Sequence, residues 1–362
     1  MKRIANFIPS LSGGGAERVV VNLLHAFDRA KITPILITGT ASGPFANKIP
    51  NDVEVIDLKT PRMRNATRPL IKLMEDQCVD LLVSHLSHAN IATLRAARKA
   101  SRRPTIAVVE HMTMSAYRGH KLRDLFIKPL ARRYYPKADH VISVSHDASR
   151  DLEQVLSLPD NSVKTIYNPV VSSELEQHAN EQTSQPLLQF PGKLILGVGR
   201  LSEQKDFSTL IHGFSRLRAQ TKAQIHLAIL GTGEQQKLLE ALISKLGLTR
   251  AVTLVGFQDN PYVWMKRADL FVLSSRWEAL PTVLIEAMAC GTNVVSTDCP
   301  SGPREIVPEQ FHSHLVPVGD AQCLAEQMHR VLSNPVDAQK WITAASRFSF
   351  AHAACAYSDL LP

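Results

Sequence analysis

The chain has 362 residues, which is too long for one ordinary hydrophobic core and predicts two domains of roughly 150 to 200 residues. Its 44% hydrophobic and 20% charged residues are typical of a globular protein and exclude a disordered one. The 5 cysteines form no Cys-x-x-Cys pair, which argues against a disulfide framework or a zinc site and favours a reducing compartment. The opening apolar run is too short for a signal peptide, and no stretch is long enough to span a membrane.

The net charge of +8 is unevenly distributed along the chain. Residues 62–137 contain 16 lysine and arginine residues against 5 acidic residues, a local net charge of +11. Three interpretations remain open: a solvated basic face, a surface for anionic lipid or an anionic acceptor, and a nucleic-acid site. Nucleic acid ranks last, because no DNA- or RNA-binding motif accompanies the charge.

In the first part of the chain, short apolar runs alternate with amphipathic stretches. A helix is predicted over residues 16–27, where Val19, Leu23 and Phe27 fall along one stripe. The alternation predicts a parallel sheet covered by helices on both faces. Strands are predicted at residues 3–9, 32–39, 79–85, 105–111 and 140–145, followed by a segment at 163–170 that ends in an Asn-Pro turn signal.

Residues 171–192 are polar, lack a strand period and are predicted to be a linker between a first domain, 1–170, and a second domain, 193–345. In open α/β sheets of this kind, ligands bind at the carboxyl ends of the strands. We therefore expect the site in the loops that follow the strands, at a cleft between the two domains. The strands of the second domain are predicted at residues 193–199, 224–231, 251–257, 269–275, 292–298 and 314–319.

Two loops are candidates for binding phosphate. "PSLSGGGAER" (9–18) places Gly13, Gly14 and Gly15 between the first strand and the first helix, where the helix N-terminus favours an anion. "ILGVGRLSEQKDF" (195–207) follows a strand of the second domain, and two cations five residues apart in it can grip a diphosphate. Neither a dinucleotide fingerprint nor a Walker A pattern is complete, so phosphate binding would use a different motif.

Three further residues are candidates by position. His111 follows a strand of the first domain. In "WEALPTVLIEAMACG", Glu278 lies in a loop after a strand, and Pro281 begins a buried helix that Gly291 closes. Glu286 then lies about one turn inside that helix, and a carboxylate there can accept hydrogen bonds from ribose hydroxyls.

Four segments, in chain order, resemble the retaining family 4 glycosyltransferases of the GT-B fold: "SLSGGGAERVV", "GVGRLSEQKDF", "SSRWEALPTVLIEAMACG" and "DCPSGPREIV". The Glu-x7-Glu spacing is the most specific mark of that family. The resemblance covers nearly the whole chain, because residues 346–362 are similar to the family's C-terminal helix, which crosses back to the first domain. It implies an α/β fold of two Rossmann-like domains that face each other across a cleft.

The resemblance also implies roles for single residues. The second domain would bind a UDP-sugar, with Arg200 and Lys205 on the diphosphate and Glu286 on the ribose. Glu278 would lie at the donor sugar, and His111 would lie near the sugar or the acceptor, and these two are the candidate catalytic residues.

Other donor contacts are implied by the same resemblance. Gly14 and Gly15 would face the phosphates from the first domain. No Asp-x-Asp pair occurs in the chain, which agrees with a site that needs no metal and no cofactor. Many family members have Gly after the first Glu, whereas this chain has Ala279, which puts the identity of the sugar in doubt. The donor-binding segment between the two glutamates comprises Ala279, Leu280, Pro281 and Thr282.

The loop "DCPSGPREI" resembles a subset of the family that adds N-acetylhexosamine or hexose to lipid-linked glycans at the cytoplasmic face of the inner membrane. This implies a polyprenyl-diphosphate acceptor and an anionic membrane surface as partners. We expect residues 117–138 to supply a basic helix for that surface, with Lys128, Arg132 and Arg133 as candidates. An ordinary helix packed on the sheet is the alternative. For the whole chain, a nucleotide-sugar epimerase of the same fold and a catalytically silent nucleotide-sugar-binding protein remain the alternatives.

Overall fold

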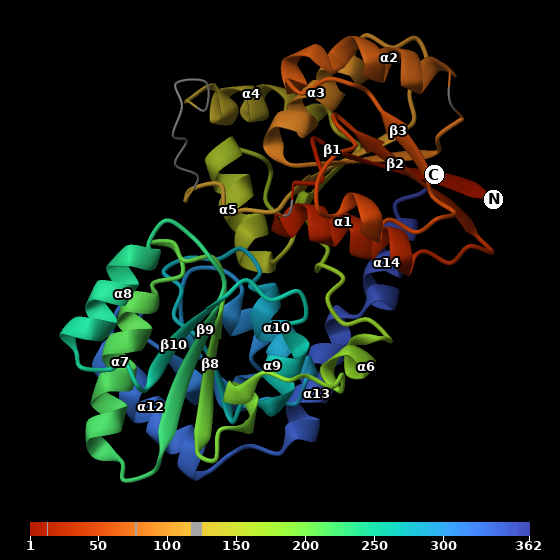
Figure 1. Cartoon of the computed structure of the whole chain (residues 1–362). Helices are drawn as coiled ribbons and strands as arrows, with labels where there is room; N and C mark the ends of the chain where they lie inside the picture. Colours follow the sequence, from red (N-terminus) through yellow and green to blue (C-terminus); the bar gives the residue numbers. More distant parts are fainter. Residues whose placement is uncertain (13, 77, 117–124) are drawn as a thin grey trace. The chain divides into compact units, whose positions relative to one another are not determined.

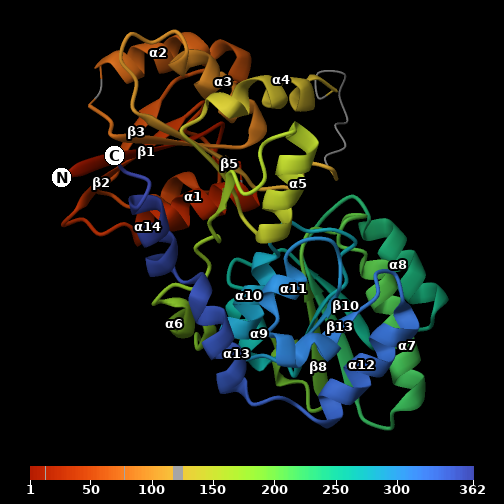
Figure 2. The same ribbon diagram turned by 180° about the vertical axis from the view of Figure 1, so that it is seen from behind.

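The computed structural model describes residues 1–12, 14–76, 78–116 and 125–362. The chain divides into two compact units, the first made of Met1–Val170 and Phe348–Pro362 and the second of Val171–Arg347. Each unit contains one parallel sheet with helices on both faces (Figure 1, and from behind in Figure 2). The predicted fold class, two Rossmann-like α/β domains, is confirmed.

The first sheet has the strand order β3-β2-β1-β4-β5-β6-β7. The chain order reverses between β1 and β4, and in doubly wound sheets ligands bind at such a reversal. Strand β3 was not predicted; it is a short edge strand with no fully buried residue, so it carries little apolar signal. The strands are β1 (Lys2–Ile8), β2 (Ile32–Thr38), β3 (Glu54–Asp57), β4 (Leu81–His85), β5 (Thr105–Glu110), β6 (His140–Ser143) and β7 (Val163–Thr165).

Helices cover both faces of this sheet. The predicted stripe of the first helix is confirmed, because Val19, Leu23 and Phe27 are all buried. Figure 1 shows α1 and α14 on one face of the sheet and α2, α3 and α4 on the other. The helices are α1 (Gly15–Ala26), α2 (Thr67–Asp76), α3 (Ser87–Ala97), α4 (Ile127–Tyr134), α5 (His146–Leu156) and α14 (Phe350–Ser358).

The second sheet repeats the same winding with the order β10-β9-β8-β11-β12-β13. Its reversal lies between β8 and β11, which pair through Leu270 and Ile195. The strands are β8 (Lys193–Val198), β9 (Ile225–Leu230), β10 (Val252–Gly256), β11 (Leu270–Leu273), β12 (Val294–Thr297) and β13 (Leu315–Val316). The helices are α6 (Leu175–Ala179), α7 (Phe207–Gln220), α8 (Gln236–Lys245), α9 (Tyr262–Arg267), α10 (Thr282–Ala289), α11 (Pro303–Ile306), α12 (Ala321–Ser333) and α13 (Ala338–Ala345).

Segment 171–192 and the C-terminal helix α14 do not follow a simple division of the chain into one domain after the other. The polar segment 171–192, predicted to be a linker, belongs to the second unit, where α6 packs against α9 and its Leu175 and Ala179 are buried. Two apolar residues in a polar stretch were too few to predict this packing. At the other end, α14 packs on α1 and therefore belongs to the first unit. Within the described ranges, no helix combines the length and apolar character needed to cross a membrane.

Candidate active site

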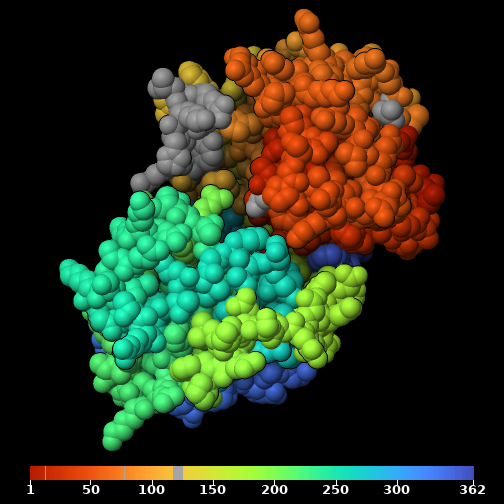
Figure 3. All heavy atoms as spheres, viewed as in Figure 1, coloured from red at the N-terminus to blue at the C-terminus, as the bar shows by residue number. Residues whose placement is uncertain are grey.

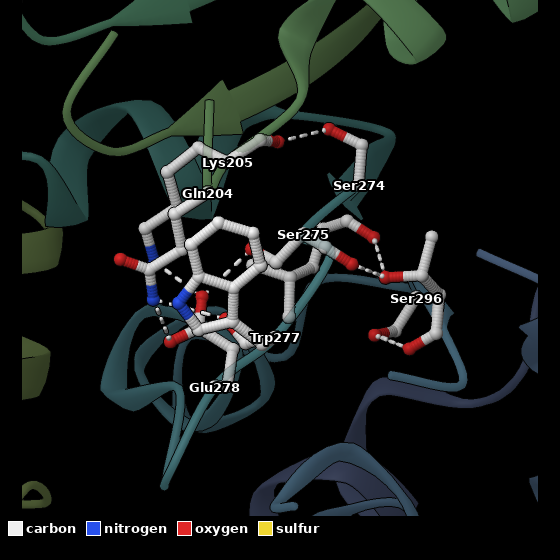
Figure 4. Close-up of polar contacts among 9 residues, drawn as sticks. Gln204, Lys205, Ser274, Ser275, Trp277, Glu278 and Ser296 are labelled. Atoms are coloured by element: carbon white, nitrogen blue, oxygen red, sulfur yellow. Dashed lines mark hydrogen bonds and ion pairs between the residues drawn. The ribbon is translucent and has the colours of Figure 1, made fainter. Parts of the chain in front are cut away.

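Two loops of the second unit meet at the reversal of its sheet. One follows β8 and carries Lys205, and the other follows β11 and carries Glu278. Because β8 and β11 are neighbours, these side chains come together although they lie 73 residues apart: Lys205 Nζ is 2.5 Å from Glu278 Oε1 (Figure 4). The structure thus joins two of the predicted site residues in one ion pair.

The Glu278 carboxylate is buried, with 7% of the residue exposed, and neutral donors hold it as well. Ser275 Oγ donates to Oε1 at 2.7 Å, and Gln204 Nε2 lies 3.4 Å from Oε2. The Gln204 amide also donates to the backbone carbonyl of Trp277 at 2.9 Å, so it is fixed against the same loop (Figure 4). A buried charge with one opposite charge and additional hydrogen bonds is compensated, whereas removal of one partner leaves a costly isolated ion.

The backbone beside Lys205 is held by its neighbours. Asp206 adopts a left-handed conformation with φ of 44°, which few residues other than glycine tolerate. Its carboxylate accepts from Thr209 Oγ1 at 2.8 Å at the start of α7 and from Arg276 Nε at 3.0 Å. Ser274 Oγ donates to the Lys205 carbonyl at 2.8 Å. The two loops are therefore tied to each other on both sides of the ion pair.

Gly199 makes room for the lysine. A Cβ atom at Gly199 would lie 3.2 Å from three carbons of the Lys205 side chain, so the lysine stem runs along a backbone without a side chain. Gly231, with φ of 127°, supports the same loop, because a Cβ atom there would lie 2.0 Å from the Gly199 carbonyl oxygen. Arg200, which directly follows Gly199 in this loop, is exposed.

The segment after Glu278 is buried as predicted. Ala279, Leu280 and Pro281 are buried and Thr282 is half-buried at the first position of α10. Glu286 lies on α10 and is 2% exposed. Gly302, in the loop after β12, has φ of 91° and packs so closely that a Cβ atom would lie 2.5 Å from Pro281 Cδ.

In the first unit, His111 lies directly after β5 and contacts another histidine. His85, at the end of β4, has its Nδ1 at 3.0 Å from His111 Nε2. The other ring nitrogen of His85 lies 3.2 Å from Asn6 Oδ1 in β1. Sequence reasoning identified His111 but missed Asn6, a polar residue inside β1, and His85, the last residue of β4. The signal of each was a polar side chain in a largely apolar strand.

Both histidines are neutral. Burial lowers the pKa of His111 to about 4. Burial, and the repulsion that a protonated His111 would exert, lower the pKa of His85 well below its usual value. With the Asn6 oxygen as acceptor, His85 donates from Nε2 and accepts at Nδ1 from His111 Nε2–H. His111 Nδ1 is then an acceptor, and it has no hydrogen-bond partner among the residues that the structure describes.

Glu110, which precedes His111, is the centre of a second buried network. Tyr135 Oη donates to its Oε1, Ser87 Oγ donates to Oε2 at 3.0 Å, and Asn90 Nδ2 lies 3.4 Å from Oε1. Burial raises the pKa of Glu110 to about 7 although the three hydrogen bonds oppose the shift. The network ties β5 to α3 and to the turn that follows α4.

The glycine loop of the first unit ends at the N-terminus of α1. Gly14 caps that helix and Gly15 is its first residue, while Gly13 lies outside the described residues. A Cβ atom at Gly14 would lie 2.4 Å from Glu17 Oε2, and Ser12 Oγ donates to Glu17 Oε1 at 3.2 Å. A carboxylate of the chain itself therefore lies at the helix end that was predicted to favour an anion.

Comparison with known proteins identifies the family. Residues 13–174 match the family described as Glycosyltransferase Family 4, and residues 180–348 match Glycosyl transferases group 1. The chain is 30% identical over 346 residues to N-acetylgalactosamine-N,N'-diacetylbacillosaminyl-diphospho-undecaprenol 4-alpha-N-acetylgalactosaminyltransferase of Campylobacter jejuni, covering 92% of this chain and 91% of that protein. The chain belongs to the family 4 glycosyltransferases.

Two further proteins are similar to this glycosyltransferase, one in sequence and one in fold. It is 25% identical to a second Campylobacter jejuni protein, GalNAc-alpha-(1->4)-GalNAc-alpha-(1->3)-diNAcBac-PP-undecaprenol alpha-1,4-N-acetyl-D-galactosaminyltransferase, over 92% of this chain and 90% of that one. Its fold matches that of Anabaena HepE, solved in complex with UDP, with a TM-score of 0.77, 22% identity and 99% of each chain covered. The GT-B fold that the sequence predicted is confirmed.

The three basic residues predicted for a membrane surface lie on the first unit of the glycosyltransferase. Lys128, Arg132 and Arg133 are on α4, but Arg132 donates to the Val155 carbonyl at the end of α5 at 2.6 Å, so it has a structural contact as well. The adjoining Leu125 and Phe126 are 69% and 64% exposed, whereas residues 117–124 of the predicted basic helix lie outside the described residues.

Cations continue across the neighbouring helices. The helices α2, α3 and α4 pack side by side in one layer (Figure 1). Exposed cations on these helices and directly after α3 and α4 therefore spread along this layer, instead of forming a single cluster. These cations are Arg68, Lys72, Arg95, Arg98, Lys99, Arg133 and Lys137.

Proposed function

We propose that this glycosyltransferase moves a hexose or N-acetylhexosamine from a UDP-sugar to a lipid-linked glycan, with retention of the anomeric configuration. The observation that carries the proposal is the Lys205–Glu278 pair at the reversal of the second sheet. Support for the donor comes from the UDP bound to HepE. Support for the acceptor comes from the diphospho-undecaprenol named in both Campylobacter relatives.

The second unit would bind the donor. Lys205, Arg200 and the N-terminal backbone of α10 supply positive charge for the diphosphate, which must leave with its negative charge balanced. Fixed cations and a helix end can do this without a metal ion. Glu286 would accept hydrogen bonds from the ribose hydroxyls, and Glu278 would lie at the sugar. His111 Nδ1, held as an acceptor, suits a hydroxyl of the sugar or of the acceptor.

The decisive experiment is a transfer assay with a panel of UDP-, GDP- and ADP-sugars and polyprenyl-diphosphate glycans, in the presence of a chelator. One UDP-sugar should be used, and the anomeric configuration of the product should match that of the donor. Lys205→Ala and Glu278→Gln should each lower the rate by about 10²- to 10³-fold. The control is Lys237→Ala, which removes an exposed lysine from α8.

Three outcomes would contradict the proposal. Full activity in both site variants would remove the site assignment. Conversion of the UDP-sugar without an acceptor would favour an epimerase of the same fold. Binding of the UDP-sugar with no turnover of any kind would favour a silent nucleotide-sugar-binding protein.

We also propose that the cationic face of α2, α3 and α4 binds an anionic membrane surface, where such an acceptor would lie. Exposed Leu125 and Phe126 add apolar contact beside the charges. Arg133→Glu combined with Lys137→Glu should reduce salt-sensitive co-sedimentation with anionic vesicles by at least about thirtyfold, since each cation near such a surface contributes ~1 kcal/mol and two are lost. The matched control, Arg216→Glu with Arg218→Glu on α7, changes the same charge and should have no effect. Equal loss in both pairs would mean that net charge alone matters.

A further inference from the structure

The lysine that the proposed function assigns to the donor diphosphate is already paired. Lys205 Nζ lies 2.5 Å from Glu278 Oε1, and only 16% and 8% of the two side chains are exposed. Few water molecules screen such a pair, so the carboxylate strongly reduces the attraction of Lys205 for a second anion. A diphosphate therefore has to compete with Glu278 for the same ammonium group.

The geometry lets the lysine move while its backbone stays. Asp206 and Ser274 hold the backbone on either side of the Lys205 carbonyl. The lysine stem, in contrast, runs along Gly199, which has no side chain to contact it. Glu278 has the opposite support, because Ser275 and Gln204 donate to it independently of Lys205 (Figure 4).

We propose that Glu278 is the internal counter-ion of Lys205, that the donor diphosphate displaces it, and that Gln204 and Ser275 keep Glu278 in place during the exchange. The inference rests on the proposed function and deepens it. Before the donor binds, the ion pair compensates two buried charges. After the donor binds, Lys205 neutralises the diphosphate and no longer neutralises Glu278.

The exchange has a chemical consequence. As the bond between the sugar and the diphosphate weakens, positive charge develops on the sugar ring, as it does in other glycosyl transfers. A carboxylate paired with lysine stabilises that charge poorly, whereas one held by neutral donors stabilises it well. Glu278 would thus become effective only when a diphosphate is bound. Gln204 and Ser275 are positioning residues in this account, because they act through Glu278.

The test is calorimetric titration of the full chain with UDP, and with GDP and ADP for comparison. Glu278→Gln should bind UDP about five- to tenfold more tightly than the wild type, since it removes the competing charge. Lys205→Met should weaken UDP binding, and in that background Glu278→Gln should have no further effect. The matched control is Glu203→Gln in the same loop, where the side chain is 69% exposed; it should change the affinity by less than about twofold.

Gln204→Ala and Ser275→Ala test the positioning role. Each should lower kcat about tenfold while the affinity for UDP stays within about twofold, since the loss of one hydrogen bond to a charged group is of this size. Unchanged kcat in both variants would overturn the positioning role.

The titration separates failure of the inference from failure of the proposed function. If UDP binds the wild type but Glu278→Gln binds it equally or less well, the counter-ion inference is wrong and the donor site stands. If no nucleoside diphosphate binds the wild type or Glu278→Gln, the proposed donor is wrong, and the inference fails with it. Circular dichroism and the melting temperature of each variant show whether it is folded.

Discussion

The carboxyl ends of the two sheets present different polar chemistry. In the first unit, Asn6, His85 and His111 form a chain of neutral hydrogen bonds, and Glu110 keeps its proton up to about pH 7. In the second unit, Lys205 and Glu278 are charged and paired at the corresponding reversal of the sheet. Six strands of each sheet follow the same order, so the difference arises from residues in and after the strands and not from the winding.

This difference fits two kinds of ligand group. Neutral donors and acceptors recognise hydroxyl groups without attracting unrelated ions, whereas buried charges recognise a diphosphate. A Rossmann-like sheet supplies the position of a site, and the residues in the carboxyl-terminal parts of its strands and in the loops after them decide the chemistry. We call the group Asn6, His85, Glu110 and His111 the neutral edge, and the group around Lys205 and Glu278 the charged edge. Substitutions at the two edges should therefore change different properties of the protein.

The largest effect expected from the neutral edge concerns stability and pH. Folded Glu110 holds its proton up to about pH 7, whereas in the unfolded chain the Glu110 carboxyl has its ordinary pKa of 4.5. In this window the folded state binds more protons, so the contribution of Glu110 to stability is present below pH 4.5 and is lost as the pH rises through 7. Glu110→Gln has no such loss. The free energy of unfolding of this variant, relative to that of the wild type, should therefore rise by up to about 3 kcal/mol between pH 4.5 and pH 7.

Urea unfolding at several pH values checks this, and the difference between the two proteins is the quantity to follow. The lowered pKa values of His85 and His111 act in the opposite direction in both proteins, because unfolding lets the rings take up protons at low pH. A difference that stays constant with pH would show that Glu110 is ionised when buried.

Much of this edge could not be read from the sequence. The apolar runs predicted the strands, and position after a strand predicted His111. Asn6 was missed because it stands between apolar residues inside a strand, and His85 because it is the last residue of a buried strand. Which strands are adjacent determines whether such residues meet. Glu110 was adjacent to a candidate residue, but its partner Tyr135 comes from a turn 25 residues away.

The charged edge was easier to predict, for a physical reason. Its residues lie in loops with glycine and proline, so the motif is continuous in sequence even though the fold brings two loops together. The sequence predicted Lys205 and Glu278 as separate ligands of one donor. Their pairing, and the support from Gln204, depend on β8 and β11 being neighbours.

A smaller effect is expected from Asp206→Ala at the charged edge. Alanine loses the hydrogen bonds at the start of α7, which contribute about 1 kcal/mol, and the left-handed conformation costs about another 1 kcal/mol. The free energy of unfolding should fall by ~2 kcal/mol. The transfer rate should also fall, because Lys205 directly precedes Asp206 in the chain. Asp206→Asn keeps both the cap and the tolerance for positive φ and should lose less than half as much. Equal losses in the two variants would mean that the Arg276 ion pair dominates instead.

The smallest effect is expected from His85→Leu at the neutral edge. Leucine removes the acceptor for His111 Nε2–H, so the proton on the His111 ring is no longer confined to Nε2. We expect kcat to fall about five- to tenfold, the size of one neutral hydrogen bond, with the KM for the donor unchanged. Nitrogen-15 NMR of histidine-labelled protein reports which ring nitrogen of His111 carries the proton, and His25→Gln, at an exposed position, is the control. A lower kcat without a change in the protonated nitrogen would mean that His85 only fills space. A change in both would show that the neutral edge works by fixing a hydrogen-bond direction, in contrast to the charge pairing of the second unit.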